Sequence, residues 1–406
     1  MLNAAPSNRY DAVVVGGGPA GAATALMLAR AGWKVAIVEK SRYPRPKVCG
    51  EFISASTFPL LAELGLLEAV RGLAGPEIRR VAIFAGETVS AAPMPAVGGA
   101  FGKWGQALGR EHLDLLLLEA AARAGADLWQ PYRVASLEPL RRGWRCEIAQ
   151  DRKGSTLLAD TIVAANGSWE KSAWLPECDA PHRASDLIAF KAHFDGADLA
   201  PDLMPLLVFP GGYGGMVRSD QGRVSLSCCI TRKTLNRCRK DEERAGDAVL
   251  KHIARSCQGV ADALACAELR ESWHAAGPIR PGIRTGFADG LFRAGNAAGE
   301  AHPIIAEGIT MAIQSAWLLA RALISAQDEL ADPSALAETG RAYSARWRGH
   351  FAGRIRAASA FAHTLMRPRS AALAITLPRR FPAVLTFCAG LSGKTRQVPI
   401  ATPPRA

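Results

Sequence analysis

The fold is decided near the N-terminus by the stretch YDAVVVGGGPAG, residues 10–21. Its first half is a short valine-rich run, typical of a buried β-strand, and its second half is a glycine-rich turn. An alanine-rich segment, residues 19–30, follows with a helical pattern, and residues 34–38 are apolar again. We therefore predict a strand, a tight turn, a helix and a second strand, which form one parallel βαβ unit of about 30 residues.

The glycines of this turn have the spacing that a dinucleotide requires. Gly16 permits the tight turn, Gly18 lets the backbone approach a pyrophosphate, and Gly21 lets the helix and strand pack closely. The helix that begins at Pro19 and Ala20 offers N–H groups and a positive dipole end to the phosphates. Three spaced glycines alone would be a weak signal in a chain with 39 glycines. The strand before them and the helix after them make a dinucleotide site the better interpretation.

The next strand ends in Glu39 and Lys40, which we expect on the same side of the dinucleotide. A carboxylate at this place accepts hydrogen bonds from ribose hydroxyls.

Composition supports an anionic ligand and excludes several other classes. The chain has 406 residues, is 49% hydrophobic and carries a formal net charge of +12. This excess favours phosphates, but no basic run of the nucleic-acid type occurs, so we expect no nucleic-acid partner. Nine cysteines without a CxxC pair indicate reduced thiols and no metal site. The first residues lack a signal-peptide pattern and no run of about 20 apolar residues occurs, so a cytoplasmic location is expected.

The rest of the chain reads as an interrupted domain. Residues 185–230 form short β-like runs, residues 291–294 return to a strand, residues 309–324 to a helix, and the chain is helical and basic from 333 onward. We predict an α/β protein with three parts. They are a discontinuous cofactor domain (1–75, 105–180 and 275–328), a β-rich substrate domain (76–104 and 181–274) and a helical C-terminal region (329–406).

The order of motifs resembles the glutathione-reductase-type FAD proteins, which include para-hydroxybenzoate hydroxylase, the flavin halogenases and geranylgeranyl reductase. The resemblance covers residues 8 to about 325 and has three parts: the GxGxxG turn with Glu39, AANGS at 164–168, and LFRAGNAAG at 291–299 followed by Pro303 and Gly308. It implies a Rossmann FAD domain of that type, an interleaved β-rich substrate domain, FAD as cofactor and NAD(P)H as electron donor.

Three residues depart from this family's pattern. Asn166 and Asn296 stand where the family usually has Asp, and Ala306 stands where a glycine is usual. In the family the second Asp holds the ribityl chain of the flavin. Asn296 can still form hydrogen bonds with ribityl hydroxyls, so FAD binding remains the expectation.

A further motif, RPKVCGE at residues 45–51, resembles the Lys-x-Cys-Gly element of the geranylgeranyl reductase and halogenase-like branch, where it lies close to the flavin. Cys49 is therefore one candidate catalytic residue, as a proton donor, and His302, beside Pro303, is the second, as an acid or base. By resemblance Arg110 and Val134 also contact FAD. The candidate cofactor-binding residues are Gly16, Gly18, Pro19, Ala20, Gly21, Glu39, Lys40, Lys47, Cys49, Arg110, Val134, Gly295, Asn296, Pro303 and Gly308.

Three functions are consistent with the sequence. The first is a monooxygenase, or hydroxylase, that acts on a hydrophobic secondary metabolite; the halogenase string Trp-x-Trp-x-Ile-Pro is absent. The second is a reductase of prenyl C=C bonds that resembles geranylgeranyl reductase. It is favoured by the Lys-x-Cys-Gly element and by basic C-terminal helices, where Arg346, Arg348, Arg354 and Arg356 near Trp347, Phe351 and Phe361 suggest a peripheral membrane contact. The third, suggested by the two Asn replacements, is a flavin-binding protein without catalysis.

Overall fold

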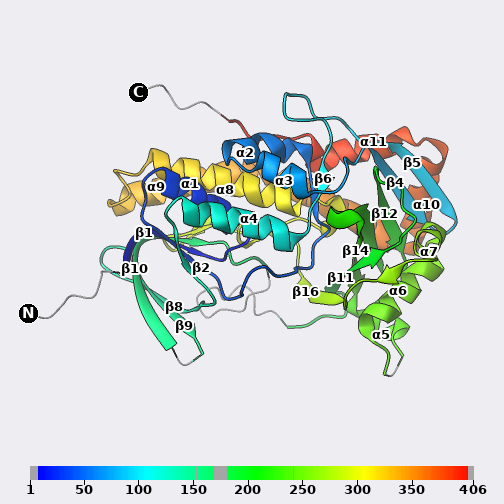
Figure 1. Cartoon of the computed structure of the whole chain (residues 1–406), viewed down its shortest axis with the longest axis horizontal. Coiled ribbons are helices and arrows are strands. Elements are labelled where there is room, and N and C mark those ends of the chain that lie inside the picture. The colour runs from blue at the N-terminus through cyan, green and yellow to red at the C-terminus, as the bar shows by residue number, and fades with distance from the viewer. Residues whose placement is uncertain (1–7, 152, 169–180, 241, 401–406) are drawn as a thin grey trace, which may run out of the picture.

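The protein is described from a computed structural model, which covers residues 8–151, 153–168, 181–240 and 242–400 of the chain. The molecule is elongated, and two large β-sheets lie along its long axis with helices packed against both (Figure 1). Sequence-distant segments build each sheet, as an interrupted domain requires. The fold is therefore mixed α/β with a helical C-terminal region, as the sequence predicts.

The first sheet is built on the βαβ unit that the glycine-rich stretch predicts. Strand β1 runs parallel to β2 on one side and to β10 on the other. The valines of β1 are buried, which explains its continuous apolar run. The strand order is β18-β19-β10-β1-β2-β7, and β8 and β9 extend from β10 as an antiparallel meander. The bounds are β1 (Arg9–Val15), β2 (Val35–Val38), β7 (Asp127–Trp129), β8 (Arg133–Pro139), β9 (Trp144–Gln150), β10 (Lys153–Ala164), β18 (Phe287–Ala288) and β19 (Leu291–Arg293).

One face of this sheet is covered by α1 (Pro19–Arg30), α4 (Arg110–Arg123) and α8 (Gly308–Ser325). Helix α1 lies between the other two and contacts both. Its alanines Ala22, Ala23 and Ala25 are fully buried, which allows the close approach of the neighbouring helices. Helix α8 is, among the described residues, the one helix long and apolar enough to cross a membrane, but 72% of it is buried inside the protein, as expected of a core helix.

The second sheet has the strand order β15-β11-β14-β13-β12-β4-β5, and β16 pairs with β11. Its neighbours are antiparallel except β4 and β12, which run parallel. The turn at residues 220–222 joins β13 to β14. The bounds are β4 (Arg80–Ala85), β5 (Thr88–Pro93), β11 (Leu187–Asp195), β12 (Leu203–Phe209), β13 (Gly212–Arg218), β14 (Val224–Thr231), β15 (Glu268–Leu269) and β16 (His274–Ile279). Strand β16 carries this sheet past the boundary expected at residue 274.

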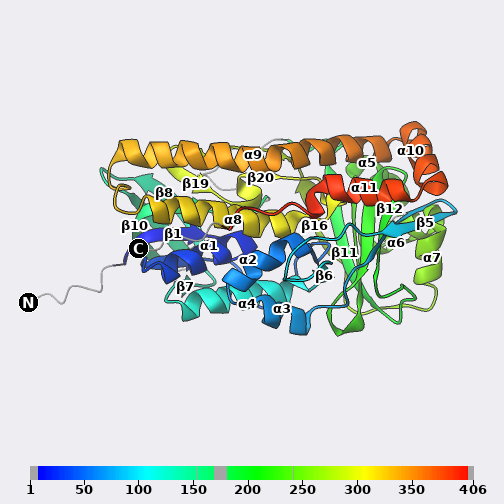
Figure 2. The same ribbon diagram turned by 90° about the horizontal axis from the view of Figure 1, so that it is seen from above.

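Helices cover both faces of the second sheet. The first face carries α5 (Arg232–Cys238), α6 (Ala245–Ser256) and α7 (Gln258–Ala263), and the second face carries the C-terminal helices α9 (Pro333–Met366), α10 (Pro368–Arg380) and α11 (Ala383–Ala389). Helix α9 begins at an Asp332 cap, whose carboxylate accepts the N–H groups of Ser334 and Ala335. It contacts β18 of the first sheet and β12 and β13 of the second, and Figure 2 shows it running along most of the molecule.

The apolar pattern of residues 54–68 predicts one helix, but the structure breaks this segment in two. A 3₁₀ turn at residues 55–57 leads into α2 (Phe58–Glu63), the chain turns at Gly65 with φ +66°, and α3 (Leu67–Leu73) follows. The apolar pattern continues through the break because both short helices bury leucines in the same core. The remaining short strands are β3 (Phe52–Ile53), β6 (Gln106–Ala107), β17 (Gly282–Ile283) and β20 (Gly299–Glu300).

Candidate cofactor and substrate site

The glycine turn has the geometry that its sequence predicts. Gly16 has φ +107°, and a Cβ on Gly16 would collide with the backbone of Ala165, which directly follows β10. A Cβ on Gly21 would collide with the carbonyl oxygen of Gly16, so Gly21 serves helix–strand packing. Helix α1 starts at Pro19 without a side-chain cap and without an acid in its first turn. This end of the helix is therefore suited to an anionic ligand.

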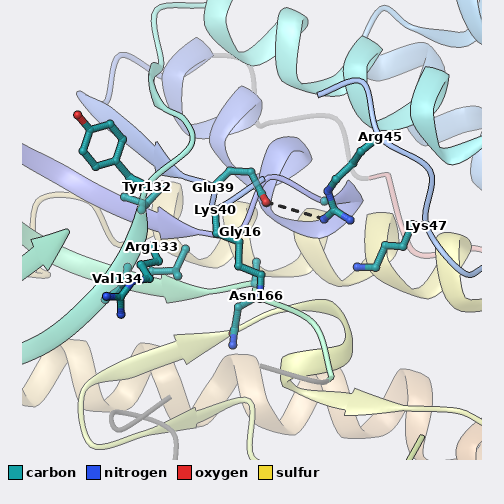
Figure 3. A pocket seen from close by; sticks show the side chains of 13 residues that line it. Gly16, Glu39, Lys40, Arg45, Lys47, Tyr132, Arg133, Val134 and Asn166 are labelled. Carbon is teal, nitrogen blue, oxygen red and sulfur yellow. Dashed lines mark ion pairs between the residues drawn. The ribbon is translucent and has the colours of Figure 1, made fainter. Parts of the chain in front are cut away.

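Glu39 is held rigidly beside the turn. Its Oε2 accepts the N–H of Gly17 at 2.8 Å, and its Oε1 accepts the N–H of Ser41 at 2.8 Å. The guanidinium of Arg45 lies 3.8 Å from Oε1 (Figure 3). A carboxylate has about four acceptor sites, so these contacts fix its orientation and leave acceptor capacity for sugar hydroxyls.

Glu39 borders a narrow pocket of about 40 Å³, which we call the dinucleotide pocket. Among the predicted residues, Gly16, Gly18, Glu39, Lys40, Lys47 and Val134 line it. Sequence reasoning missed Arg45, Tyr132 and Arg133 as members of its wall (Figure 3). The Oδ1 atom of Asn166, also in this wall, is buried and has no hydrogen-bond partner among the described residues.

A much larger cavity of about 590 Å³, which we call the chamber, adjoins the dinucleotide pocket. The two share Gly18, Lys47 and Ala165 as wall residues. From there the chamber extends between the second sheet and the helices α9 and α11. Of the predicted residues it is lined by Gly18, Pro19, Ala20, Lys47, Cys49, Arg110, Asn296, His302, Pro303 and Gly308. Gly21 and Gly295 are in neither wall.

Two cations stand where the pocket meets the chamber. The buried Arg110 donates from Nε and Nη2 to the two carboxylate oxygens of Asp114, each at 2.7 Å, and its Nη2 faces Gly18. Burial, and after it the nearby charge of Arg110, lower the pKa of the Lys47 ammonium to about 8. A bound diphosphate would offset both effects, because negative charge favours the protonated amine.

The second glycine motif brings an amide and a carboxyl group together. Asn296 donates from Nδ2 to Ser168 Oγ at 2.9 Å and to Glu300 Oε1 at 3.3 Å. Gly295 supports this turn from behind, since its N–H donates to Ser315 Oγ at 2.9 Å. Glu300, which sequence reasoning missed, is buried and lines the chamber. The one sequence feature that could have indicated Glu300 is its position four residues after Asn296.

His302 forms a polar pair inside the chamber. Its Nδ1 lies 3.1 Å from the hydroxyl oxygen of Tyr213 on β13, and both side chains are buried. Burial lowers the pKa of His302 to about 4, and the nearby His363 adds to this shift. The imidazole is therefore neutral at pH 7 and can accept a proton. Sequence reasoning missed Tyr213 as a member of the site.

Cys49 also lies in the chamber wall, where its sulfur accepts the N–H of Glu51 at 3.4 Å. Burial raises the pKa of Cys228 well above its ordinary value and that of Cys229 to about 12, so both chamber thiols stay protonated at neutral pH. Among the apolar residues of the second sheet, Met204 and Met216 line the chamber, whereas Phe209 packs in the core of that sheet.

The loop before α8 shows why the family usually has a glycine at the position of Ala306. Ala306 adopts a left-handed conformation, φ 52° and ψ 40°, which a glycine adopts more easily. Pro303 and Gly308 lie on either side of it in the chamber wall. Beneath them the buried Lys394 donates to Ile305 O at 2.9 Å and to Glu307 Oε1 at 3.2 Å. The C-terminal segment thus completes the floor of the chamber, a role that the sequence did not predict.

In the described part of the chain, one group of side chains could meet at a metal ion: Glu111, His112 and Asp220. Arg223 already forms ion pairs with Glu111 and Asp220. Asp220 Oδ1 also accepts the N–H of Gly109 at 2.7 Å, which ties α4 to the second sheet. The ion pairs and this hydrogen bond make the group a structural junction between α4 and the second sheet.

These residues fit a dinucleotide cofactor that continues into the chamber. Two buried wall atoms have no hydrogen-bond partner among the described residues: Asn166 Oδ1 in the dinucleotide pocket and Glu300 Oε2 in the chamber. Unpaired buried acceptors are costly, and hydroxyl groups of a ligand would satisfy them. At Gly18 a Cβ would meet only Arg110 Nη2, at 3.7 Å, so the backbone there is open to a ligand.

The fold and the site define a class of protein with a dinucleotide-type Rossmann turn and a large adjoining chamber. A family model described as an FAD binding domain matches residues 9–348. The chain belongs to this family, the FAD binding domain family.

Curated relatives share part or most of this chain. Conditioned medium factor receptor 1 of Dictyostelium discoideum is 27% identical over 79% of this chain, which spans 64% of the receptor's length. Digeranylgeranylglycerophospholipid reductase of Methanosarcina acetivorans is 24% identical, over 84% of this chain and 80% of the reductase. The chain spans less than two thirds of the first of these relatives.

Solved structures show the same fold at low identity. The flavin-dependent brominase Bmp2 superposes with a TM-score of 0.75 at 18% identity, covering 95% of this chain and 94% of the brominase. PqsL of P. aeruginosa, in complex with 2-aminobenzoylacetate, superposes with a TM-score of 0.72 at 20% identity, covering 89% of this chain and 98% of PqsL. These likenesses establish the architecture and leave the reaction to the residues of the site.

Proposed function

We propose that the protein is a monooxygenase that hydroxylates a hydrophobic molecule carrying an aromatic or enolic hydroxyl group. The single observation that carries this proposal is the Tyr213–His302 pair, buried inside an otherwise largely apolar chamber beside the dinucleotide turn. An apolar cavity provides affinity for a hydrophobic ligand, and a few polar groups fix its orientation. A hydroxyl group of the substrate is the natural partner of such a pair.

The protein's own residues have defined tasks in this reaction. Bound FAD supplies the redox chemistry with O₂, and the protein supplies orientation and a dry environment. Tyr213 receives the substrate hydroxyl, and the neutral His302 accepts the proton that Tyr213 passes on. Cys49 lies in the same wall and donates its proton where one is consumed. We further propose NAD(P)H as the electron donor and a cytoplasmic location for the enzyme.

The test is to supply the purified enzyme with FAD, NADPH, ¹⁸O₂ and a series of long-chain alkylphenols. The expected product contains one ¹⁸O atom. Tyr213→Phe and His302→Asn should lower kcat about 100-fold, the range typical of general acid–base groups. Met204→Leu, which changes the same chamber without removing a polar atom, should retain most of the activity. Turnover that proceeds equally well without O₂ would rule out monooxygenation.

A second candidate, reduction of prenyl C=C bonds, is favoured by one surface feature. Phe387 is 66% exposed and Leu391 is 60% exposed, and Leu391 also belongs to the chamber wall. Arg379 and Arg380 lie at the end of the adjoining helix α10. Exposed apolar side chains beside cations fit a peripheral contact with an anionic lipid surface, from which a prenyl chain would enter the chamber.

The residues that the sequence suggested for this membrane contact are placed differently. Trp347, Phe351 and Arg354 are buried, so they cannot insert into lipid. The reductase candidate therefore rests on α10 and α11. It predicts anaerobic saturation of a prenyl substrate by dithionite-reduced enzyme, and binding to anionic vesicles that Phe387→Ser with Leu391→Ser abolishes. If both are absent while ¹⁸O is incorporated, the monooxygenase proposal stands and the reductase is excluded.

A further inference from the structure

We propose that Glu300 supplies, from the next turn of chain, the carboxylate with which this protein holds the ribityl hydroxyls of FAD. In the related flavoproteins that carboxylate belongs to an Asp at the position of Asn296. The inference rests on FAD binding, which the family shows, and is independent of the reaction proposed above.

The structure places the Glu300 carboxyl group in the chamber wall beside Asn296. It belongs to the short strand β20, is 4% exposed, and borders the chamber together with Asn296 and Ser168. Its Oε1 accepts the Asn296 amide at 3.3 Å. Its Oε2 is buried and has no hydrogen-bond partner among the described residues. A buried acceptor with unused capacity in a cavity wall indicates a donor on the ligand, and ribityl hydroxyls are such donors.

The charges around Glu300 support a carboxylate with a function. Arg284 Nη2 lies 3.8 Å from Oε2, beyond hydrogen-bonding distance, and Lys47 contributes a second positive charge. Burial raises the pKa of Glu300, and Arg284, a hydrogen bond with the Ser168 side chain and Lys47 offset part of that effect. Hydroxyl donors from a bound ligand would favour the ionised form further.

The exchange of Asp for Asn at position 296 then has a physical reason. An Asp at this position would bring two carboxylates into contact within a buried wall, where like charges disfavour ionisation of both. An amide at the same position instead donates to Glu300 and to Ser168 and fixes both groups. Asn296 and Glu300 therefore form a matched pair, with Asn296 as a positioning residue.

The experiment measures the dissociation constant of FAD for the apo-protein by fluorescence quenching, with no substrate present. The four proteins are the natural chain, Glu300→Gln, Asn296→Asp and the double variant Asn296→Asp with Glu300→Gln. Each single variant should bind FAD about tenfold more weakly, because Glu300→Gln removes the carboxylate and Asn296→Asp opposes it with a second one. The double variant, with one carboxylate again, should bind within about threefold of the natural chain. Glu87→Gln, an exposed control, should bind normally.

Unchanged affinity of Glu300→Gln, or a double variant as weak as Glu300→Gln, would overturn the proposal. The reduction potential of bound FAD gives an independent readout, because loss of a nearby negative charge should raise it in Glu300→Gln and the double variant should restore it. If Glu300→Gln does not fold, Glu300→Asp, which keeps the charge and shortens its reach, takes its place in the same comparison. Because turnover is not measured, failure of the monooxygenase proposal leaves this result unaffected.

Discussion

His302 shows how one buried residue sets a pH response. Its pKa in the folded protein is about 4, below the value of about 6.5 for an unfolded histidine. Below pH 6.5 the unfolded chain binds a proton that the folded chain does not bind, so the free energy of unfolding falls as the pH drops from 6.5 towards 4. The loss contributed by His302 should reach about 3 kcal/mol.

Urea unfolding at several pH values checks this effect. His302→Asn should flatten the decline in unfolding free energy between pH 6.5 and 4. His182→Asn, at an exposed position, should leave the pH profile of the natural protein unchanged. Equal slopes for His302→Asn and the natural chain would contradict a neutral, buried imidazole.

At the scale of elements, the loop between β2 and β3 carries a charge whose state is set by its surroundings. Burial and Arg110 lower the pKa of Lys47 to about 8, and a protonated Lys47 favours a bound diphosphate. FAD affinity should therefore fall as the pH rises above 8, by up to about tenfold per unit. Titrations of the apo-protein with FAD at pH values between 6.5 and 9.5 measure this fall in affinity. Lys47→Met should bind weakly at every pH, whereas Lys40→Met, at an exposed lysine of the same pocket, should keep the pH dependence.

The elements that the sequence predicts well are those encoded by neighbouring residues. The valine run of β1, the glycines after it and the alanines of α1 each need only a local pattern, and the structure has them as expected. The break at Gly65 was missed because the leucines on both sides bury in one core, so the apolar pattern hides the turn.

The contents of the site follow a similar division. Its glycines, Glu39 and Arg110 lie in recognisable motifs, and the structure brings them to the walls or supports of the joined cavities. Tyr213 and His302, which form a pair, lie 89 positions apart in the sequence, and Lys394 and Glu307 lie 87 positions apart. No local pattern encodes such contacts. Whether each candidate residue binds FAD stays a prediction.

For the whole molecule, one buried ionic cluster joins the cofactor half to the second sheet. Glu51, which follows the Lys-x-Cys-Gly element, forms an ion pair with Lys191 on β11, and both oxygens of Glu51 lie 3.1 Å from His193 Nε2. Burial acts to raise the pKa of Glu51, but His193 and Lys191 outweigh it and hold that pKa well below its usual range. Glu51 also has φ 62°, a strained conformation that these partners stabilise.

Removing one charge of this cluster should therefore strongly destabilise the folded protein. Glu51→Gln leaves the fully buried Lys191 ammonium without its carboxylate and should lower the free energy of unfolding by about 3–5 kcal/mol. Asp202→Asn breaks the ion pair with Arg80, a residue exposed at the surface, and should cost less than about 1 kcal/mol. Denaturant unfolding measures the loss of unfolding free energy in both variants. Equal losses would show that the buried cluster contributes no more to stability than the surface ion pair.

The long helix α9 has a mechanical consequence. With 34 residues it measures about 50 Å, and it touches both sheets. Because this continuous helix packs against both sheets, it prevents the two sheets from moving apart as independent bodies. Access to the chamber must then come from smaller movements, of side chains and of the short α11 segment at its rim, while heat or denaturant should melt the two halves in a single step.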